Sequence, residues 1–464
     1  MAAAATTEDW KDEPQLARAL LLLRQERFAE VLDLVSELGE PSAGVLVAGA
    51  RAATALADPT RSENLSRRAV AGLPSDPRGY AILAEVLRSE GRATEAEGAL
   101  QAGLRAAPAD EALSYALAGL YWVQQRHGEA TAVLDALLRR RPQDALLKSR
   151  LAGLLLAVGD FERGWALYEG RYDRAEAAPD RLARPELAFP EWRGEALEGR
   201  SILVLAEQGY GDQIQFCRYA NVLKARGARR VTIACRAALA PLMESLEGVD
   251  QVILAQDGSS PPDHDFWVLM LSLPHLTGTR LSTIPSMSPY LSVPAPYRER
   301  WAPLIAPEGL RVGLVWKGNS ENPADGQRSL PSLRSLRPLW DVPEIAFISL
   351  QMGAAGLEAA TAPPDQPLVR LGDQIRDFGD TAAIVEQLDL LISVDSAPAH
   401  LAGALGKPAF VLLPYPADFR WLLNRSDSLW YPTLRLFRRE RGEDWSRVVE
   451  RLVSELRAVA KARR

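Results

Sequence analysis

Cysteine is nearly absent from this sequence: Cys217 and Cys235 are the only two among 464 residues. Two cysteines cannot build a disulfide framework, so we expect a reducing compartment and assign both side chains to the core. No apolar run approaches the length needed to cross a bilayer. The first residues lack a basic segment and turn acidic at once, which argues against a secretory signal peptide. These absences together predict a cytoplasmic protein.

An excess of basic charge is also missing. The chain has 54 Lys and Arg against 60 Asp and Glu, a formal net charge of −6. Such a balance offers no basic face for a phosphodiester backbone, so we expect no nucleic-acid partner and only local anion sites. With 47% hydrophobic and 25% charged residues, the chain has the composition of a globular protein, long enough for about three domains.

The first third of the sequence repeats itself every 34 residues. Each repeat has a proline, an aspartate suited to a helix N-cap, a Leu-Ala pair and a small residue in its second helix. The matching positions are Pro74, Pro108 and Pro142; Asp76, Asp110 and Asp144; Leu83, Leu117 and Leu151; and Ala96, Ala130 and Gly164.

This pattern resembles the tetratricopeptide repeat over about 76–174, with a looser helical pair before it. We therefore predict an α superhelix over 1–174, whose stacked units leave a concave groove for a peptide or another helix. The alternative is that the array serves only as a dimerisation or spacer element.

Beyond the repeats, prolines and charges without periodicity over 175–199 indicate a linker. Short apolar runs then alternate with amphipathic stretches, which predicts doubly wound parallel sheets. Clustered prolines near 285–307 indicate a crossing between a first lobe, 200–305, and a second lobe, 306–464. The predicted strands are 201–206, 230–235, 251–254, 266–271, 311–316, 345–350, 390–394 and 409–413, and a helix over about 445–460 ends the chain.

The stretch 390–408 has the pattern of a strand, a turn, a short alanine-rich helix and the next strand. Asp395 and Ser396 are N-cap residue types, and His400 falls in the first helical turn. In an open parallel sheet, ligands bind where such turns leave the strands, because free N–H groups of the helix attract a phosphate. The alternative is an ordinary capping aspartate beside a buried, hydrogen-bonded histidine. Two further turns, Gly-Tyr-Gly-Asp at 209–212 and Trp-Lys-Gly-Asn at 316–319, also follow predicted strands.

These turns, in this order behind a repeat array, resemble bacterial repeat-containing glycosyltransferases with a GT-B fold of two facing Rossmann-like lobes. The catalytic half is similar to the ADP-heptose lipopolysaccharide heptosyltransferases. Its pairing with repeats resembles flagellin-modifying glycosyltransferases and, more distantly, protein O-GlcNAc transferases. The resemblance spans nearly the whole chain and depends on the order of the motifs. It implies a nucleotide-sugar donor, no cofactor, and a protein acceptor, with flagellin as a candidate, in the groove of the repeats; an oligomer is compatible with it.

The resemblance also implies roles for individual residues. Asp212 would be the general base that takes a proton from the acceptor hydroxyl, although it could equally be the N-cap of its helix. Lys317 would meet the donor phosphates as a point charge, or lie solvated in its loop. Ser396 and the N–H groups of Ala397 and Ala399 would hold the leaving phosphate without a metal. The remaining implied donor-binding residues are Asp395 and His400, and the supporting turns contain Gly209, Gly211, Asn319 and Arg328.

The sequence departs from the family pattern in one place: Ser396-Ala397 stands where Thr-Gly is common, which leaves the donor's identity open. No Asp-x-Asp triplet lies at a predicted strand end, so we do not expect metal dependence. Gln208 could face a sugar or solvent, and Arg328 could meet a phosphate or solvent. The aromatic residues Trp421, Trp430 and Tyr431 could stack on a base, but we assign them to the core.

Two other classes of function fit the same sequence. One is a scaffold, in which the repeats bind a partner and the two-lobed half is a non-catalytic docking surface. The other is an isomerase or hydrolase of nucleotide sugars, because two-lobed folds also host that chemistry. The repeats argue mildly against the second, since an enzyme acting on a small molecule alone has no evident use for a peptide groove.

Overall fold

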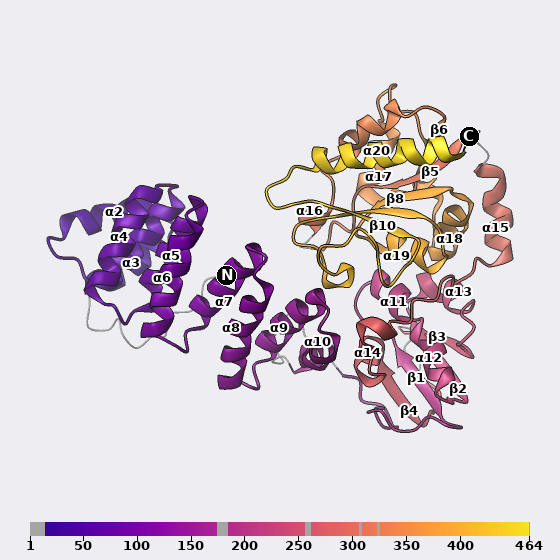
Figure 1. The fold of residues 1–464 in the computed structure, drawn as a ribbon, viewed down its shortest axis with the longest axis horizontal. Coiled ribbons are helices and arrows are strands. Elements are labelled where there is room, and N and C mark those ends of the chain that lie inside the picture. The colour runs from indigo at the N-terminus through magenta and orange to yellow at the C-terminus, as the bar shows by residue number, and fades with distance from the viewer. Residues whose placement is uncertain (1–13, 174–183, 256–260, 306–308, 323–324, 464) are drawn as a thin grey trace. The chain divides into compact units, whose positions relative to one another are not determined.

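A computed structural model describes residues 14–173, 184–255, 261–305, 309–322 and 325–463 of the chain (Figure 1). The chain divides into two compact units, Met1–Leu151 and Ala152–Arg464. Each unit is considered by itself. Among the described residues, no helix combines the length and the apolar character that a bilayer crossing requires.

The first unit is a stack of helical pairs (Figure 1). The aspartates of the repeat cap its helices as expected: Asp110 accepts a hydrogen bond from the Leu113 N–H at 2.8 Å, and Asp144 accepts one from the Leu147 N–H at 2.9 Å. The small residues Ala96 and Ala130 are buried where neighbouring helices approach. The helices are α1 (Pro14–Arg24), α2 (Phe28–Glu37), α3 (Ala43–Ala55), α4 (Pro59–Gly72), α5 (Pro77–Ser89), α6 (Ala93–Ala106), α7 (Glu111–Val123), α8 (His127–Arg140) and the first part of α9 (Ala145–Val158).

The second unit contains two lobes, and the first is built on a four-stranded parallel sheet of order β3-β2-β1-β4. Its strands are apolar and buried at the centre because helices cover both faces (Figure 1). Cys217 and Cys235 lie in this core, as predicted. The elements are β1 (Ser201–Leu205), α11 (Tyr210–Phe216), α12 (Tyr219–Ala225), β2 (Arg230–Cys235), α13 (Ala240–Met243), β3 (Gln251–Leu254), β4 (Phe266–Leu269) and α14 (Leu273–Leu276).

The second lobe has a six-stranded parallel sheet of order β10-β9-β8-β5-β6-β7. Counted from its own first strand, β5, this is the 3-2-1-4-5-6 order of a doubly wound nucleotide-binding sheet. The fold class predicted from the sequence, helical repeats followed by two Rossmann-like lobes of the GT-B type, is thus confirmed. The elements are α15 (Ala295–Trp301), β5 (Leu310–Val315), α16 (Asp325–Arg328), β6 (Ile345–Ser349), α17 (Gly353–Ala360), β7 (Val369–Arg370), α18 (Phe378–Gln387), β8 (Leu390–Val394), α19 (Ala397–Ala404), β9 (Ala409–Leu413), β10 (Leu434–Arg438) and α20 (Trp445–Arg463).

The last helix of the repeats, α10 (Phe161–Tyr168), belongs to the second unit, although the sequence places it in the array. The physical reason is its aromatic face. The Trp165 ring lies 5.8 Å from the rings of both Phe216 and Phe419, and the Phe161 ring lies 6.1 Å from that of Trp430. These contacts tie α10 to both lobes.

The segment expected to be a linker also packs on the first lobe. Residues 174–183 lie outside the described residues, but Trp192 is buried and exchanges backbone contacts with β4: its N–H donates to the Trp267 carbonyl at 2.7 Å. Two strands were not predicted. β7 has only two residues, and β10 alternates Leu and Phe with Arg, so neither forms a continuous apolar run.

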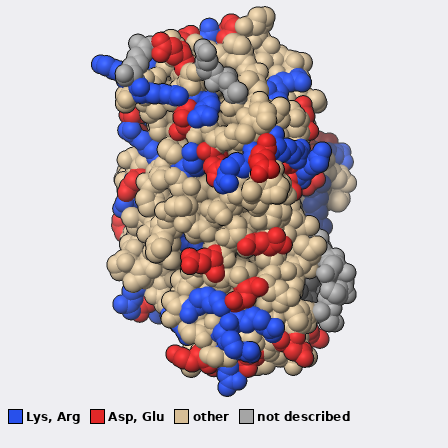
Figure 2. All heavy atoms as spheres, turned by 90° about the vertical axis from the view of Figure 1, so that its right-hand side faces the viewer, with Lys and Arg blue, Asp and Glu red and all other residues tan. Residues whose placement is uncertain are grey.

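Charged side chains of both signs are interspersed over the face drawn in Figure 2. The described residues visible there form no continuous basic surface. This distribution agrees with the net charge of −6.

Candidate functional site

The carboxyl ends of both sheets open into one cleft of about 1030 Å³ in the second unit. The turn after β1 reaches the cleft from the first lobe, and the turns after β5 and β8 reach it from the second. These strands flank the points where the strand order of each sheet reverses, and ligands bind at such points. The volume lies at the upper end of the usual range for small-molecule sites, about 300–1,000 Å³. Ten of the residues proposed from the sequence line this cleft, and Ala399 is not among its lining residues. The ten are Gly209, Gly211, Asp212, Lys317, Asn319, Arg328, Asp395, Ser396, Ala397 and His400.

Asp212 is held by bonds to both of its carboxylate oxygens. Helix α11 begins after Gly209, and Asp212, at the third helical position, accepts the Gly209 N–H on Oδ2 at 2.8 Å. Its Oδ1 accepts from a guanidinium nitrogen of Arg420. The carboxylate therefore closes the capping arrangement without being the N-cap residue itself, and its side chain stays 18% exposed on the cleft. A hydroxyl brought to this oxygen would meet a fixed acceptor.

Arg420 is the main residue of the cleft that sequence reasoning missed. It lies in a short 3-10 helix, Phe419–Trp421, in the loop after β9, and pairs with Asp212 and with Asp418 at 2.8 Å. Although burial opposes the charge, Asp418 and Asp212 raise the pKa of Arg420 well above its usual value. The signal available in the sequence was an Asp-Phe-Arg triplet shortly after a predicted strand, in a stretch without periodicity.

His400 is a buried, neutral histidine. Its ring stacks on Trp421 with centroids 5.2 Å apart, and its Nδ1 lies 3.0 Å from the Tyr431 hydroxyl. Burial and then the Arg420 charge lower the pKa of His400 to about 3. If the phenol donates to Nδ1, Nε2 carries the ring proton. A Cβ on Gly211 would lie only 2.9 Å from His400 Cδ2, so the glycine permits α11 to approach α19.

The turn after β8 offers a ligand less than the sequence suggested. The Ser396 hydroxyl bonds the Val394 carbonyl at 3.2 Å and gives no cap to α19. The Ala399 N–H, expected to meet a phosphate, instead donates to the Ser396 carbonyl at 3.0 Å. Pro398 has no N–H, which leaves the Ala397 N–H as the first-turn donor without an acceptor in the described part of the chain.

Asp395 lies on the same turn, and its Oδ1 is 4.0 Å from His400 Nε2. Burial and the neighbouring Asp418 charge raise the pKa of Asp395 to about 6, against the opposing influence of Arg420 and Arg328. The Asp395 carboxyl therefore changes its charge near pH 6, and it lies close to His400 Nε2, the nitrogen that would carry the proton of the imidazole ring.

Lys317 is half-buried and ion-paired. Its Nζ pairs with Glu358 of α17 at 2.7 Å, and the same carboxylate accepts the Trp316 indole N–H at 3.2 Å and the Leu333 N–H at 2.6 Å. A phosphate at this strand end would meet the lysine only in competition with Glu358.

Asn319 begins the polar stretch 319–327, of which 323–324 fall outside the described residues, and Arg328 is the last residue of α16. Arg328 Nε lies 3.4 Å from Asp325, and the Ser329 hydroxyl donates to the same carboxylate at 2.9 Å. The Ser329 oxygen in turn accepts the Gly318 N–H at 2.9 Å, which joins the loop to the end of β5. Asn319 accepts the Glu321 N–H within the loop.

Two exposed arginines complete the lining and were also missed. Arg236, after β2, donates to the Gln208 carbonyl at 2.9 Å, and Gln208 itself lines the cleft. Arg376, before α18, has no guanidinium partner within the described ranges. Among the described residues, no three or more His, Cys, Asp or Glu side chains are grouped as metal ligands would be. The aromatic residues assigned to the core, Trp421, Trp430 and Tyr431, are buried, and Trp421 supports the histidine ring.

Comparison with known proteins identifies the repeats directly. Residues 87–154 match the tetratricopeptide repeat family, which confirms the repeat prediction. A curated relative, Protein FlbA of Caulobacter vibrioides, is 29% identical over 335 residues that cover 66% of this chain and 54% of that protein. The chain thus spans about half the length of the curated relative it matches.

Among solved structures, the chain is similar to the ADP-heptose LPS heptosyltransferase II of E. coli, with 14% identity, 57% of this chain and 99% of that chain covered, and a TM-score of 0.42. It is also similar to a glycosyl transferase family 9 protein of Veillonella parvula, with 15% identity, 58% and 100% coverage, and a TM-score of 0.42. A repeat protein of Thermus thermophilus is 21% identical over 36% of this chain and 94% of that chain, with a TM-score of 0.30.

Proposed function

We propose that the chain is a metal-independent glycosyltransferase that moves a sugar from a nucleotide-sugar donor to a hydroxyl of a protein acceptor docked by the repeats, with flagellin as a candidate. The observation that carries the proposal is the single cleft into which turns of both lobes open, with Asp212 from one lobe and His400 from the other among its lining residues. One lobe thereby supplies a carboxylate and the other supplies groups for an anion.

Asp212 is the proposed general base. Its carboxylate is fixed by the Gly209 N–H and Arg420, so it is oriented before substrate arrives. As the acceptor hydroxyl attacks the anomeric carbon, its proton passes to the carboxylate, and the bond from that carbon to the donor phosphate breaks. Acceptor binding on the first lobe and donor binding on the second would bring the two reacting groups together.

The leaving phosphate gains negative charge during this step. The Ala397 N–H and the guanidinium of Arg328 would meet this charge, and so would the Nε2–H of His400 if Tyr431 donates to its Nδ1. Lys317 would add a further positive charge once it turns from Glu358. Stabilisation of the leaving group by such donors replaces the role that a metal ion plays in other transferases.

The test is sugar transfer followed by intact mass spectrometry. Purified chain, a panel of nucleotide sugars and flagellin as acceptor should give an acceptor heavier by one sugar residue or a multiple of it. Asp212→Asn should slow transfer by about 10²–10⁴-fold, the usual contribution of a general base. The matched control is Asp418→Asn, which removes the other carboxylate partner of Arg420 and should change the rate only a few-fold.

Transfer that is equally fast in wild type and Asp212→Asn would refute the role of this carboxylate. Donor turnover without any acceptor would favour the nucleotide-sugar isomerase or hydrolase instead. Failure to bind any nucleotide, with partner binding intact, would favour the scaffold.

A further inference from the structure

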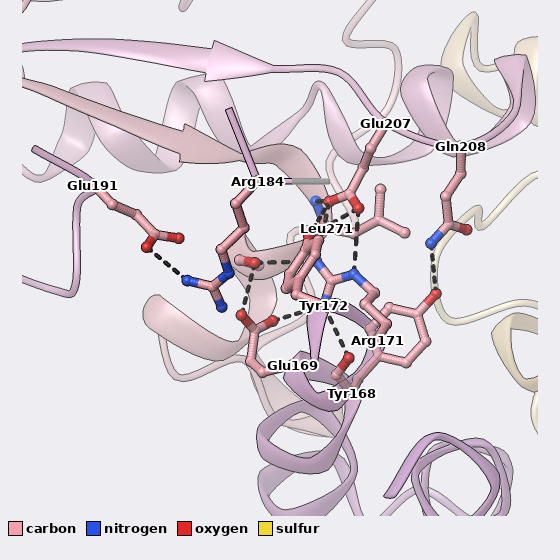
Figure 3. Close-up of polar contacts among 10 residues, drawn as sticks. Tyr168, Glu169, Arg171, Tyr172, Arg184, Glu191, Glu207, Gln208 and Leu271 are labelled. Atoms are coloured by element: carbon pink, nitrogen blue, oxygen red, sulfur yellow. Dashed lines mark hydrogen bonds and ion pairs between the residues drawn. The ribbon is translucent and has the colours of Figure 1, made fainter. Parts of the chain in front are cut away.

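The 3-10 helix that follows α10 makes a buried polar contact with the first lobe (Figure 3). Arg171 lies in a 3-10 helix, Glu169–Tyr172, that follows α10 directly, and it is only 5% exposed. Its guanidinium pairs with Glu207 at 3.0 Å, and the Tyr172 hydroxyl donates to the same carboxylate at 2.8 Å. Glu207 also accepts the N–H of Leu271, two residues past the end of β4, at 2.8 Å. One carboxylate thus joins the repeat end to the carboxyl ends of β1 and β4.

Gln208, the next residue along the chain, is held by Tyr168, the last residue of α10. Gln208 has a φ of 60°, a strained backbone conformation that a non-glycine residue keeps only where its surroundings hold it. Its side-chain amide donates to the Tyr168 hydroxyl at 3.0 Å (Figure 3), and its carbonyl accepts from Arg236 at 2.9 Å. Gln208 directly precedes the turn that carries Asp212.

Tyr168 also reaches the second lobe. Its ring lies 5.8 Å from the ring of Phe419, whose neighbour Arg420 holds the Asp212 carboxylate. Tyr168 therefore contacts Gln208, which precedes the turn that carries Asp212, and Phe419, which precedes Arg420. No other use for this half-buried hydroxyl follows from the site described above.

We propose that α10 and the Glu169–Tyr172 helix support the cleft from behind its lining residues. Tyr168 is a positioning residue for Gln208 and for the turn 209–212 that follows it. The last repeat helix sets where Asp212 stands relative to the second lobe, and it does so through Gln208. This inference rests on the proposed transfer reaction for its kinetic consequence, but its structural consequence is independent of that reaction.

The test is Tyr168→Phe in the full chain, which removes one hydroxyl and keeps the aromatic packing. The matched control is Tyr121→Phe, which removes a hydroxyl that donates to Glu97 at 3.1 Å inside the array. Two properties are measured in each variant: kcat and KM of transfer, and amide hydrogen exchange of the peptide covering 205–216.

Tyr168→Phe should lower kcat about tenfold, leave the donor KM within threefold, and raise exchange at 208–213 about tenfold, whereas Tyr121→Phe should change each within twofold. Combining Tyr168→Phe with Gln208→Ala should be no slower than the slower single variant, because both remove the same contact. If wild type is active and Tyr168→Phe changes neither kcat nor hydrogen exchange, this inference is wrong and the proposed function is unaffected. If wild type transfers no sugar, the proposed function fails, and the exchange result still decides this inference.

Discussion

Replacing Gly211 by alanine tests a close approach between the two lobes. The new Cβ would stand 2.9 Å from His400 Cδ2 and 3.4 Å from its Nε2. The ring cannot easily retreat, because Trp421 stacks against it and Tyr431 holds its other edge. Overpacking of this kind costs about 1–3 kcal/mol.

For a cooperative unit as large as Ala152–Arg464, that cost corresponds to a fall in Tm of about 2–5 °C. The assay is a thermal melt of the full chain followed through the transition of the second unit. The matched control is Gly119→Ala in α7 of the first unit, where a Cβ meets nothing within 4 Å, so the transition of the second unit should stay at the wild-type temperature. A Gly211→Ala protein that melts at or above the wild-type temperature would refute the close packing of α11 on α19.

Two further predictions concern charge in the cleft. Burial lowers the pKa of His400 to about 3, so the ring stays neutral in the folded chain, whereas in the unfolded chain it takes up a proton below about pH 6.5. The free energy of unfolding should therefore fall as the pH is lowered between these two values, by up to about 1.4 kcal/mol per pH unit. Urea titrations at pH 7 and pH 5 should show a smaller loss in His400→Gln than in wild type or in the exposed-site control His275→Gln, and equal losses in all three would contradict this. Lys317→Met should weaken binding of a nucleoside diphosphate about tenfold in calorimetry, since a charged hydrogen bond contributes about 1.5–3 kcal/mol. Glu358→Gln should leave binding unchanged or tighten it, because Lys317 is released, and equal weakening by both variants would mean that the pair acts only by holding the local fold.

The regular elements of the second unit follow from local patterns. The run 390–394 is apolar throughout and the helix after it is rich in alanine, so strand and helix were predicted close to β8 and α19. The turns between such elements carry the polar residues, and in a parallel sheet these turns meet at one edge. That geometry explains why residues far apart in sequence, such as Asp212 and His400, were correctly expected to line one cleft.

Local sequence patterns could not predict which charged residues pair with each other. Lys317 meets Glu358 across 41 positions, and Arg420 meets Asp212 across 208, so no periodicity could reveal either contact. The loop that carries Arg420 contains Leu422 and Asn424 with positive φ, a path set by tertiary packing. The role of α10 was hidden for a related reason: its repeat pattern is intact, and only its aromatic residues indicate that it packs outside the array.

The measurement that tests the central claim most directly is a thermal-shift panel of CMP, UDP, GDP and ADP on wild type and His400→Ala. A nucleotide present at 100 times its Kd adds about 2.7 kcal/mol to the unit it binds, a shift of about 4 °C for a unit of this size. One nucleotide should raise the Tm of the second unit in wild type and lose that effect in His400→Ala. If none of the four raises the Tm, the cleft is not a donor site and the glycosyltransferase account is contradicted.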